Sequence, residues 1–169
     1  MCGHIMNRKG FTLIELVMVI VLIGIIAVFV APRLGNITST KTGPFMDKLK
    51  ADIRYAQNLA MTRNRRTQVN LTNTSYSVSQ DDSAANNCSS FATVMDPAEG
   101  GWLSVTLDTG SYAGITITPG CLEYDSLGRP YNCGAGVCSV AAGSLTVQIN
   151  ANAAVVGTVT VSAQTGAVN

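Results

Sequence analysis

The first residue that could do chemistry is a lone acid inside a long apolar segment. Phe11–Ala31 runs for 21 residues and carries one charge, that of Glu15. As a helix, the segment would span ~31 Å, which matches the ~30 Å hydrocarbon core of a bilayer. A charged side chain inside that core costs about 2.5–3.5 kcal/mol. We therefore expect a membrane helix, ended or kinked by Pro32, in which the Glu15 carboxylate pairs with a cation.

Cleavage of the preceding leader would supply that cation. Arg8, Lys9 and Gly10 stand directly before the apolar segment. A cut after Gly10 would give Phe11 a new α-amine and would make Glu15 the fifth residue of the processed chain. In staggered neighbouring helices, the Glu15 carboxylate of one chain would attract the Phe11 amine of another. In surroundings of low dielectric constant this attraction is strong, so the pair would serve assembly.

Two other interpretations of the apolar segment compete with this one. An ordinary secretory signal peptide has an apolar stretch of ~7–15 residues, followed by small residues at its cleavage site. The segment here is longer, and its end lacks that pattern. A plain anchor helix would hold an unrelated periplasmic domain or enzyme at the membrane. The natural N-terminus distinguishes these alternatives, because an anchor would keep Met1 or Met6, whereas a processed chain would begin at Phe11.

Composition and charge exclude several functional classes. Apolar residues make up 47% of the chain and charged residues 12%, which excludes a disordered, highly charged protein. Residues 1–66 hold ten of the eleven Lys and Arg and three of the ten Asp and Glu, a balance of +7, whereas residues 67–169 carry −6. The acidic second half would repel phosphate and argues against nucleic acid as a partner. Because His4 is the only histidine, we expect neither catalysis nor a cofactor.

The segment Lys9–Leu16 resembles the prepilin signature of type IV pilins and type II secretion pseudopilins. The resemblance rests on the basic leader, the junction of Gly10 and Phe11, the acid Glu15 and the later Pro32. It implies that a prepilin peptidase cuts after Gly10 and methylates the new amine of Phe11. It also implies that Glu15 serves subunit recruitment and packing, and that the chain is a structural subunit of a pilus or pseudopilus.

A second, amphipathic helix is predicted to begin at Pro44, which suits the first turn of a helix and follows a polar break at residues 36–43. Its apolar residues recur at spacings of three and four, as on one helix face: Phe45, Leu49, Ile53, Ala56 and Ala60. The arginines near its end complement the helix dipole and are expected to be solvated: Arg63, Arg65 and Arg66. No aromatic residues interleave with them for stacking on bases.

The second half of the chain alternates apolar and polar residues in short runs, which is typical of β-strands. Two runs, 68–72 and 75–78, predict a hairpin, and the polar stretch 79–90 predicts a loop. Further runs cover residues 102–107, 115–118, 145–149 and 159–161. The expected fold class is α+β, with a long N-terminal transmembrane helix and then an amphipathic helix packed on an antiparallel β-sheet or sandwich.

Three further segments are similar to the GspH/FimT group of minor pilins. These are the passage from helix to strand at 49–69, the turn Tyr124–Pro130 with its aromatic-x-x-x-Gly-Arg pattern, and the last strand 157–163 leading to Thr165 and Gly166. Some members that bind DNA carry arginines just after that last glycine, and this chain has none there. The resemblance implies a minor pilin or pseudopilin. A DNA-binding or adhesive pilin at the filament tip is the alternative.

Removal of the leader would leave four cysteines, namely Cys88, Cys121, Cys133 and Cys138. An even number agrees with disulfides in an exported domain, and four cysteines permit three pairings. The short loop between Cys133 and Cys138 could close on itself, which would leave Cys88 to pair with Cys121. Alternatively, a turn at residues 126–128 would place Cys121 opposite Cys133. We favour the first arrangement over the second.

No metal site is expected. Zinc sites typically combine paired CxxC cysteines or histidines, and this chain has neither after loss of the leader. Calcium needs several oxygen ligands, but the acidic residues of the second half lack the spacing of a calcium loop: Asp81, Asp82, Asp96 and Glu99. We expect these acids to lie in solvated loops.

These inferences give an expected organisation of four segments. Residues 1–10 would be a leader removed by cleavage, 11–35 the transmembrane and filament-core helix, 36–66 a linker and amphipathic helix, and 67–169 an exported β domain. The chain would be a single-pass protein of the inner membrane with a periplasmic C-terminal domain, and would then join a pilus or pseudopilus. Its expected partners are the prepilin peptidase, other pilin or pseudopilin subunits and, before assembly, inner-membrane lipid.

Overall fold

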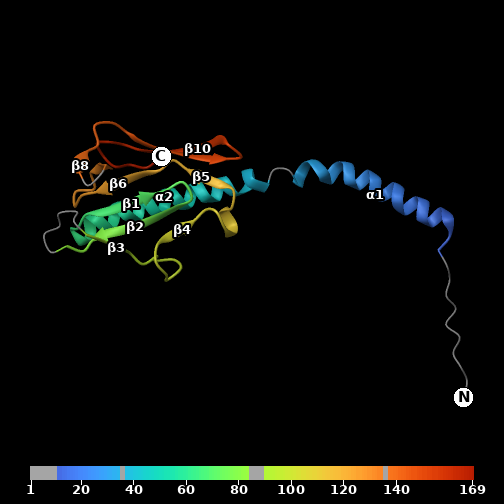
Figure 1. Cartoon of the computed structure of the whole chain (residues 1–169), viewed down its shortest axis with the longest axis horizontal. Coiled ribbons are helices and arrows are strands. Elements are labelled where there is room, and N and C mark those ends of the chain that lie inside the picture. Colours follow the sequence, from blue (N-terminus) through green and yellow to red (C-terminus); the bar gives the residue numbers. More distant parts are fainter. Residues whose placement is uncertain (1–10, 35–36, 84–89, 135–136) are drawn as a thin grey trace, which may run out of the picture. The chain divides into compact units, whose positions relative to one another are not determined.

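The computed structural model describes the chain as two compact units, residues 1–37 and 38–169 (Figure 1). The described residues are 11–34, 37–83, 90–134 and 137–169, with side chains outside 29–40, 132, 134 and 137–139. Cys88 and Gly10 therefore lie outside the described residues, and the side chains of Pro32 and Cys138 do as well.

The first unit is built on one helix, α1 (Leu13–Leu34). All large apolar side chains described at residues 11–28 are exposed, from 40% at Val17 to 82% at Leu13. The helix continues for two residues past Pro32, so it does not end at the proline, and a kink there stays a prediction.

Among the helices of the described residues, none combines the length and the apolar character that a membrane crossing demands.

The second helix, α2 (Ile37–Arg63), confirms the predicted amphipathic face. Its five predicted apolar residues are all fully buried: Phe45, Leu49, Ile53, Ala56 and Ala60. The predicted polar break at 36–43 is wrong, because the helix already covers residues 37–43 and includes Pro44 in its interior. Proline lacks only its own N–H, so the helix runs on with one backbone hydrogen bond fewer.

The strands of the second unit form two antiparallel sheets. The larger sheet has the order β3-β2-β1-β6-β7-β8, and β4 also pairs with β2. Its strands are β1 (Thr67–Leu71), β2 (Ser75–Asp81), β3 (Phe91–Thr93), β4 (Ser104–Thr106), β6 (Gly120–Tyr124), β7 (Pro130–Gly134) and β8 (Val137–Val140). The smaller sheet has the order β10-β9-β5, with β5 (Ile115–Ile117), β9 (Leu145–Ala151) and β10 (Ala154–Val161). A short 3₁₀-helix, η1 (Gly110–Tyr112), precedes β5.

The predicted hairpin is confirmed, and several strand boundaries differ from the prediction. Strands β1 and β2 pair antiparallel, with Leu71 opposite Tyr76. β2 extends to Asp81, so the predicted loop begins later than expected, and its residues 84–89 lie outside the described part of the chain. The predicted strand 102–107 is reduced to β4, because Trp102 and Leu103 instead belong to a loop that bridges back to Met95. The sequence pattern did not predict β3, β6, β7 or β8.

One hydrophobic core joins α2 to both sheets. Apolar side chains of α2 pack with those of the larger sheet, such as Val69, and of the smaller sheet, such as Ile149. The Phe45 ring contacts two tyrosines, with centroid distances of 5.2 Å to Tyr112 and 6.2 Å to Tyr76. This is the predicted α+β architecture of an amphipathic helix packed on antiparallel sheets.

A buried polar network ties α2 to β2 and to the loop before β4. The Tyr76 hydroxyl donates to Asp52 Oδ2 at 2.7 Å, and Lys48 Nζ lies 3.5 Å from both Asp52 Oδ2 and Asp96 Oδ2. Burial raises the pKa of Asp52, which the Tyr76 and Lys48 contacts only partly offset. Burial and the neighbouring Asp52 likewise raise the pKa of Tyr76, so the phenol stays protonated and donates.

Candidate functional site

The N-terminal site consists of Phe11, Thr12 and Glu15 at the beginning of α1. Thr12 O accepts from Glu15 N at 3.1 Å and from Leu16 N at 3.2 Å, and Thr12 Oγ1 lies 3.4 Å from Glu15 N. Thr12 thus occupies the N-cap position, where its hydroxyl satisfies a free amide of the first turn. Glu15 lies in that first turn, where the positive end of the helix dipole favours a carboxylate.

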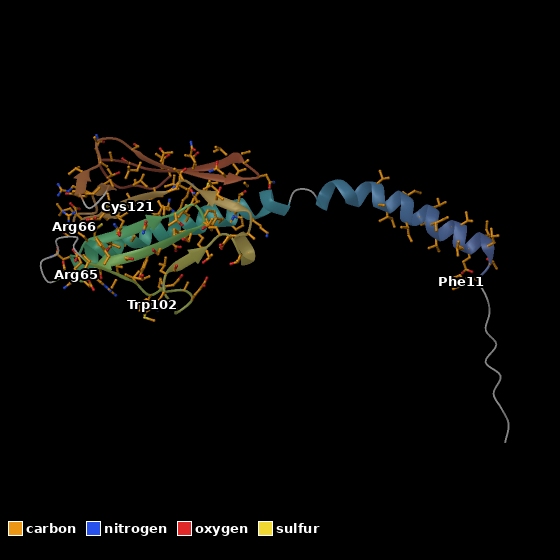
Figure 2. The ribbon with its side chains drawn as sticks, viewed as in Figure 1. Phe11, Arg65, Arg66, Trp102 and Cys121 are labelled. Atoms are coloured by element: carbon orange, nitrogen blue, oxygen red, sulfur yellow. The ribbon has the colours of Figure 1, made fainter. Side chains whose placement is uncertain are left out.

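The surface of α1 is apolar on every side around this site. Figure 2 shows its side chains extending in all directions from the ribbon, with Phe11 at the beginning. Phe11 is 79% exposed, and the Glu15 side chain is exposed as well. Within the described residues, no cation forms an ion pair with Glu15. The described side chains of α1 therefore leave an exposed apolar surface around Phe11 and Glu15.

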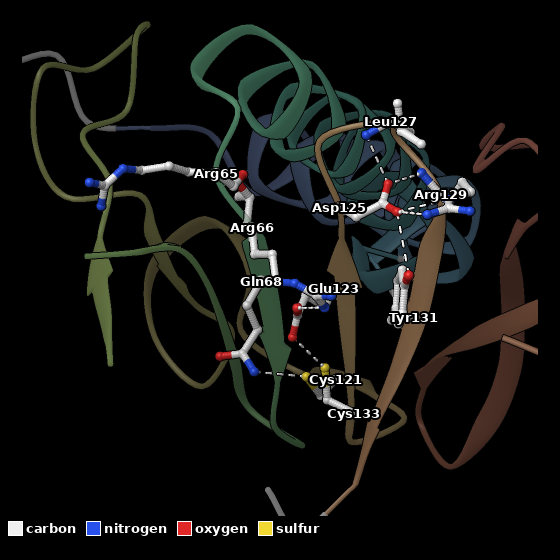
Figure 3. Close-up of polar contacts among 11 residues, drawn as sticks. Arg65, Arg66, Gln68, Cys121, Glu123, Asp125, Leu127, Arg129, Tyr131 and Cys133 are labelled. Atoms are coloured by element: carbon white, nitrogen blue, oxygen red, sulfur yellow. Dashed lines mark hydrogen bonds and ion pairs between the residues drawn. The ribbon is translucent and has the colours of Figure 1, made fainter. Parts of the chain in front are cut away.

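A second cluster joins β1, β6 and β7 around the buried acid Glu123. The Glu123 side chain is fully buried, and its Oε1 accepts from Arg66 Nη1 at 2.7 Å. The guanidinium of Arg66 also lies 4.7 Å from the centroid of the Tyr131 ring. The expectation of a solvated arginine cluster is therefore wrong for Arg66. Figure 3 shows Arg66 reaching toward Glu123, whereas Arg65 extends away from it.

The thiols of Cys121 and Cys133 complete the Glu123 cluster. Both thiols are half-buried, and their strands pair at Leu122 and Asn132, which neighbour Cys121 in β6 and Cys133 in β7. Gln68 Nε2 donates to Cys121 Sγ at 3.0 Å, and Cys133 Sγ donates to Glu123 Oε2 at 3.1 Å (Figure 3).

The two thiols differ in acidity. Hydrogen bonding with Cys121, burial and the Glu123 carboxylate raise the pKa of Cys133, so this thiol stays protonated. Hydrogen bonds from Cys133 and Gln68 instead lower the pKa of Cys121, although burial opposes them. These contacts therefore favour the thiolate form at Cys121 over that at Cys133.

The turn between β6 and β7 is organised by Asp125. Its Oδ1 accepts from the backbone amides of Leu127 and Arg129, each at 2.9 Å, and its Oδ2 lies 2.7 Å from Arg129 Nη2. The Tyr131 hydroxyl lies 3.4 Å from the same Oδ2 (Figure 3). Burial raises the pKa of Asp125, but the hydrogen bonds and the Arg129 cation outweigh burial and hold it below its usual value.

The structure brings this turn and the C-terminal segment together on α2. Gln57 Nε2 donates to Gly128 O and to Thr165 O, both at 2.9 Å. Gly166 has a φ of +68°, and a Cβ at this position would lie 2.6 Å from Gly128 O. Tyr124 OH also donates to Gly166 O at 3.3 Å. Two segments named from the sequence, Tyr124–Pro130 and Thr165–Gly166, are thus one docking region around a single glutamine.

The comparisons with known proteins agree with the N-terminal site. Residues 5–31 match the family described as the prokaryotic N-terminal methylation motif. The chain carries this N-terminal methylation motif. The matched residues include the leader positions Arg8 to Gly10, Phe11 and Glu15, which carry the resemblance to type IV pilins and pseudopilins in the sequence.

A solved structure is also similar to the chain. It is the type IV minor pilin FimU of Pseudomonas aeruginosa, with 14% sequence identity and a TM-score of 0.49, and the match covers 73% of this chain and 83% of that one. No curated protein matches the sequence. The functional argument therefore rests on the methylation motif.

The individual residues of the methylation motif are only partly placed by the structure. Phe11 and Glu15 lie at the exposed beginning of α1, whereas Gly10 lies outside the described residues. Cleavage at Gly10, methylation of Phe11 and pairing through Glu15 stay predictions. So do the disulfides, because Cys88 and the side chain of Cys138 are not among the described parts.

The acidic residues of the second half are more structured than predicted. Asp81 and Asp96 are buried rather than solvated, with 1% and 7% exposure. Asp96 Oδ1 accepts from the amides of Ala98 at 2.7 Å and Glu99 at 3.3 Å, and Asp81 Oδ1 accepts from Ser83 N at 2.8 Å. Their carboxylates thus organise turns. No group of three or more metal-ligating side chains occurs among the described residues.

Sequence reasoning missed Gln57 and Glu123, the two residues around which the β-sheet unit is organised. Glu123 did carry a signal, because it is a lone acid within the apolar run of residues 121–124, and such an acid needs a buried cation. Gln57 carried none. A single glutamine on a polar helix surface does not reveal that two distant backbone carbonyls will approach it.

Proposed function

We propose that this chain is a minor type IV pilin or a type II secretion pseudopilin, a structural subunit rather than an enzyme. The observation that carries the proposal is the match of residues 5–31 to the methylation motif. A prepilin peptidase would cut after Gly10 and methylate the amine of Phe11. The processed chain would then be inserted into a filament together with other pilin or pseudopilin subunits.

The proposal assigns one role to each segment of the chain. Residues 1–10 are the leader, 11–35 form the membrane and filament-core helix, 36–66 contain the amphipathic helix α2, and 67–169 form the exported domain. Before assembly, the chain is a single-pass protein of the inner membrane with its C-terminal domain in the periplasm. The apolar run Phe11–Ala31 and the uniformly exposed apolar side chains of α1 support these roles.

Assembly would depend on the Glu15 carboxylate and the Phe11 amine. Glu15 lies exposed in the first turn of α1, and cleavage would place a positive charge four residues before it. A pair within one chain would neutralise both groups locally. An ion pair between staggered chains would also fix the axial position of one helix relative to its neighbour. The apolar surroundings would strengthen this ion pair. The methylated amine keeps its charge, so methylation is compatible with this role.

Exchange of Glu15 for alanine tests the assembly role. We expect Glu15→Ala to insert into the membrane and to be cleaved normally, but to be depleted at least about tenfold from the filament fraction, because loss of one close ion pair in apolar surroundings costs over 1.4 kcal/mol. Immunoblots of membrane and sheared filament fractions measure both. Asp47→Ala is the matched control, since Asp47 is an exposed acid of α2. Normal incorporation of Glu15→Ala would contradict the role.

The exported domain would contain disulfides in its oxidising compartment. Cys133 has two candidate disulfide partners in this proposal. Its thiol interacts with that of Cys121 across β6 and β7, and its backbone lies opposite Cys138 in the register of β7 and β8. The lowered pKa of the Cys121 thiol favours attack by Cys121 in an exchange between these partners. Peptide mapping of the unreduced natural protein distinguishes a bond between Cys121 and Cys133 from one between Cys133 and Cys138.

A further inference from the structure

A pocket of about 750 Å³ opens beside the edge strand β3. Its walls come from α2, through Tyr55 and Arg63, and from the larger sheet, through Gln80 and Ala92. Ala92 lies opposite Gln80 in the register of β2 and β3, and its methyl group leaves the space beyond Gln80 open. We call this cavity, which Trp102 also lines, the β3 pocket.

A buried amide donor in the β3 pocket lacks an acceptor. The Gln80 side chain is 8% exposed, and its Oε1 accepts from Arg63 Nη1 at 3.2 Å. Its Nε2 is buried and has no hydrogen-bond partner among the described residues. A buried donor without an acceptor is costly, so a ligand that brings an oxygen atom to this amide would gain affinity. The pocket is therefore suited to a ligand with a carbonyl or carboxylate group.

The edge of β3 offers a row of backbone groups beside this amide. β3 is the last strand of the larger sheet in the described part of the chain. Asp82 N donates to Ser90 O at 3.1 Å and Val94 N donates to Val78 O at 3.0 Å, so even-numbered residues of this segment bond to β2. Since antiparallel pairing alternates, the backbone N–H and C=O groups of Phe91 and Thr93 point away from β2. Such an edge is a template for another strand.

The side chains around the edge define the chemistry of that strand. Trp102, labelled in Figure 2, is 69% exposed and Met95 is 60% exposed, and both apolar side chains line the pocket. Arg63 of α2 is exposed and also lines the pocket, and its one hydrogen bond among the described residues is to Gln80. Asp81 also lines the pocket, but its carboxylate is already bound by Ser83. Exposed Trp and Arg beside each other are typical of protein interaction sites.

We propose that an extended peptide segment of a partner protein, with an acidic side chain, binds along β3 as an additional strand. Its backbone pairs with the outward groups of Phe91 and Thr93. Its acidic side chain enters the β3 pocket and accepts from Gln80 Nε2 and Arg63, while an apolar side chain lies on Trp102. Main-chain pairing supplies affinity in this mode of recognition, and the pocket supplies specificity. The proposal does not depend on the chain being a pilin.

A phage-displayed library of seven-residue peptides, selected against the full chain in detergent micelles, tests the proposal. We expect the enriched peptides to share an Asp or Glu with an apolar residue two positions away, because side chains on one face of a strand alternate. The best peptide is then synthesised with a fluorescent label, and its affinity is measured by anisotropy. No enrichment, or enrichment without an acidic residue, would overturn the proposal.

Variants of β3 separate strand addition from other binding modes. Thr93→Pro removes one outward N–H, and we expect it to weaken the peptide at least about tenfold, whereas Thr93→Val keeps that N–H and should bind normally. Arg63→Gln should weaken peptide binding about fivefold, because this is the loss expected for a charged contact at a partly exposed site. The affinity of the peptide for this variant should also depend less on salt concentration. Near-UV circular dichroism checks the fold of each variant.

A change in the peptide keeps the test valid if Thr93→Pro fails to fold. The same peptide, N-methylated at alternate amides, should lose binding to the unaltered chain in one of its two methylation patterns, because only one set of amides faces β3. Equal binding of both methylated peptides would overturn the proposal. Displacement of the peptide by an oligonucleotide at equal concentration would also overturn the proposal, since it would assign the β3 pocket to nucleic acid.

Discussion

The two α-helices of the described residues, α1 with 22 residues and α2 with 27, differ in their surfaces. In α2, every residue of the predicted apolar face is fully buried against strands of its own chain. In α1, every large apolar side chain described is at least 40% exposed. The apolar face of α2 is thus covered by strands of its own unit, whereas the described residues of the first unit leave the apolar side chains of α1 exposed.

Because of this difference, we expect changes in α2 to affect the stability of the second unit and changes in α1 to affect assembly. Residues of α2 determine whether the second unit folds, because burial of apolar area is the main term that favours folding. Residues of α1 have few contacts to lose in the isolated chain, so their changes should affect membrane residence and incorporation instead. The first prediction below compares matched residues of α2 and α1, and the other two change residues of the second unit, each with a matched control.

The largest effect is expected from Leu49→Ala in α2. Leu49 is fully buried, so loss of its side chain should lower the free energy of unfolding by about 2–5 kcal/mol. The matched change in α1 is Leu22→Ala, where the side chain is 57% exposed and no such loss is expected. Urea unfolding of the full chain in detergent, followed by near-UV circular dichroism, measures both. Equal destabilisation by the two variants would break the comparison.

A smaller effect is expected from Gly166→Ala, at the docking region on α2. The positive φ alone costs alanine roughly 1–2 kcal/mol, and a Cβ 2.6 Å from Gly128 O would in addition force the two segments apart. Gly100→Ala is the control, because Gly100 has a φ of +73° but nothing within 4 Å of its Cβ position. Thermal unfolding should show the larger loss at Gly166. Equal losses of stability in Gly166→Ala and Gly100→Ala would mean that the close packing of the turn and the C-terminal segment around Gln57 does not hold them together.

The smallest effect is expected from Asp125→Asn and depends on pH. Because the folded state holds the pKa of Asp125 below its usual value, its contribution is present above that usual value and is lost as the pH falls through the lowered one. At pH 7 we expect a loss of about 1–3 kcal/mol, from the hydrogen bonds to a charged acceptor. Asp108→Asn, at an exposed position, is the control.

Unfolding curves at several pH values check the Asp125 prediction. The difference between Asp125→Asn and the unaltered chain should shrink as the pH falls from the usual carboxyl pKa through the lowered pKa of Asp125, because the unfolded chain takes up its proton first and both folded side chains are neutral only below the lowered value. A difference that stays constant with pH would show that the ionised form of Asp125 does not stabilise the turn.

Sequence alone predicted the two helices and the core face of α2, because both signals are local. A predominantly apolar segment of 21 residues and a repeat of apolar residues at spacings of three and four need no knowledge of distant contacts. The hairpin of β1 and β2 was predicted for the same reason. The beginning of α2 was misplaced, since polar residues 37–43 and Pro44 resemble a break although a helix accommodates them.

Contacts between distant segments could not be predicted. Strands β6 and β7 carry the buried Glu123 and the thiols of Cys121 and Cys133, so they lack the alternation of a half-buried strand. The buried position of Glu123 depends on Arg66, which lies 57 residues away in the chain. The β3 pocket likewise joins Arg63 to Trp102, and no spacing rule connects two such residues.

Mass spectrometry of the natural N-terminus tests the central claim most directly. If α1 is an assembly helix that becomes competent when the leader is removed, the mature protein from membranes and filaments should begin at Phe11. It should also carry one methyl group on its α-amine. An N-terminus at Met1 or Met6, with the leader attached, would contradict the account and would make α1 an ordinary membrane anchor.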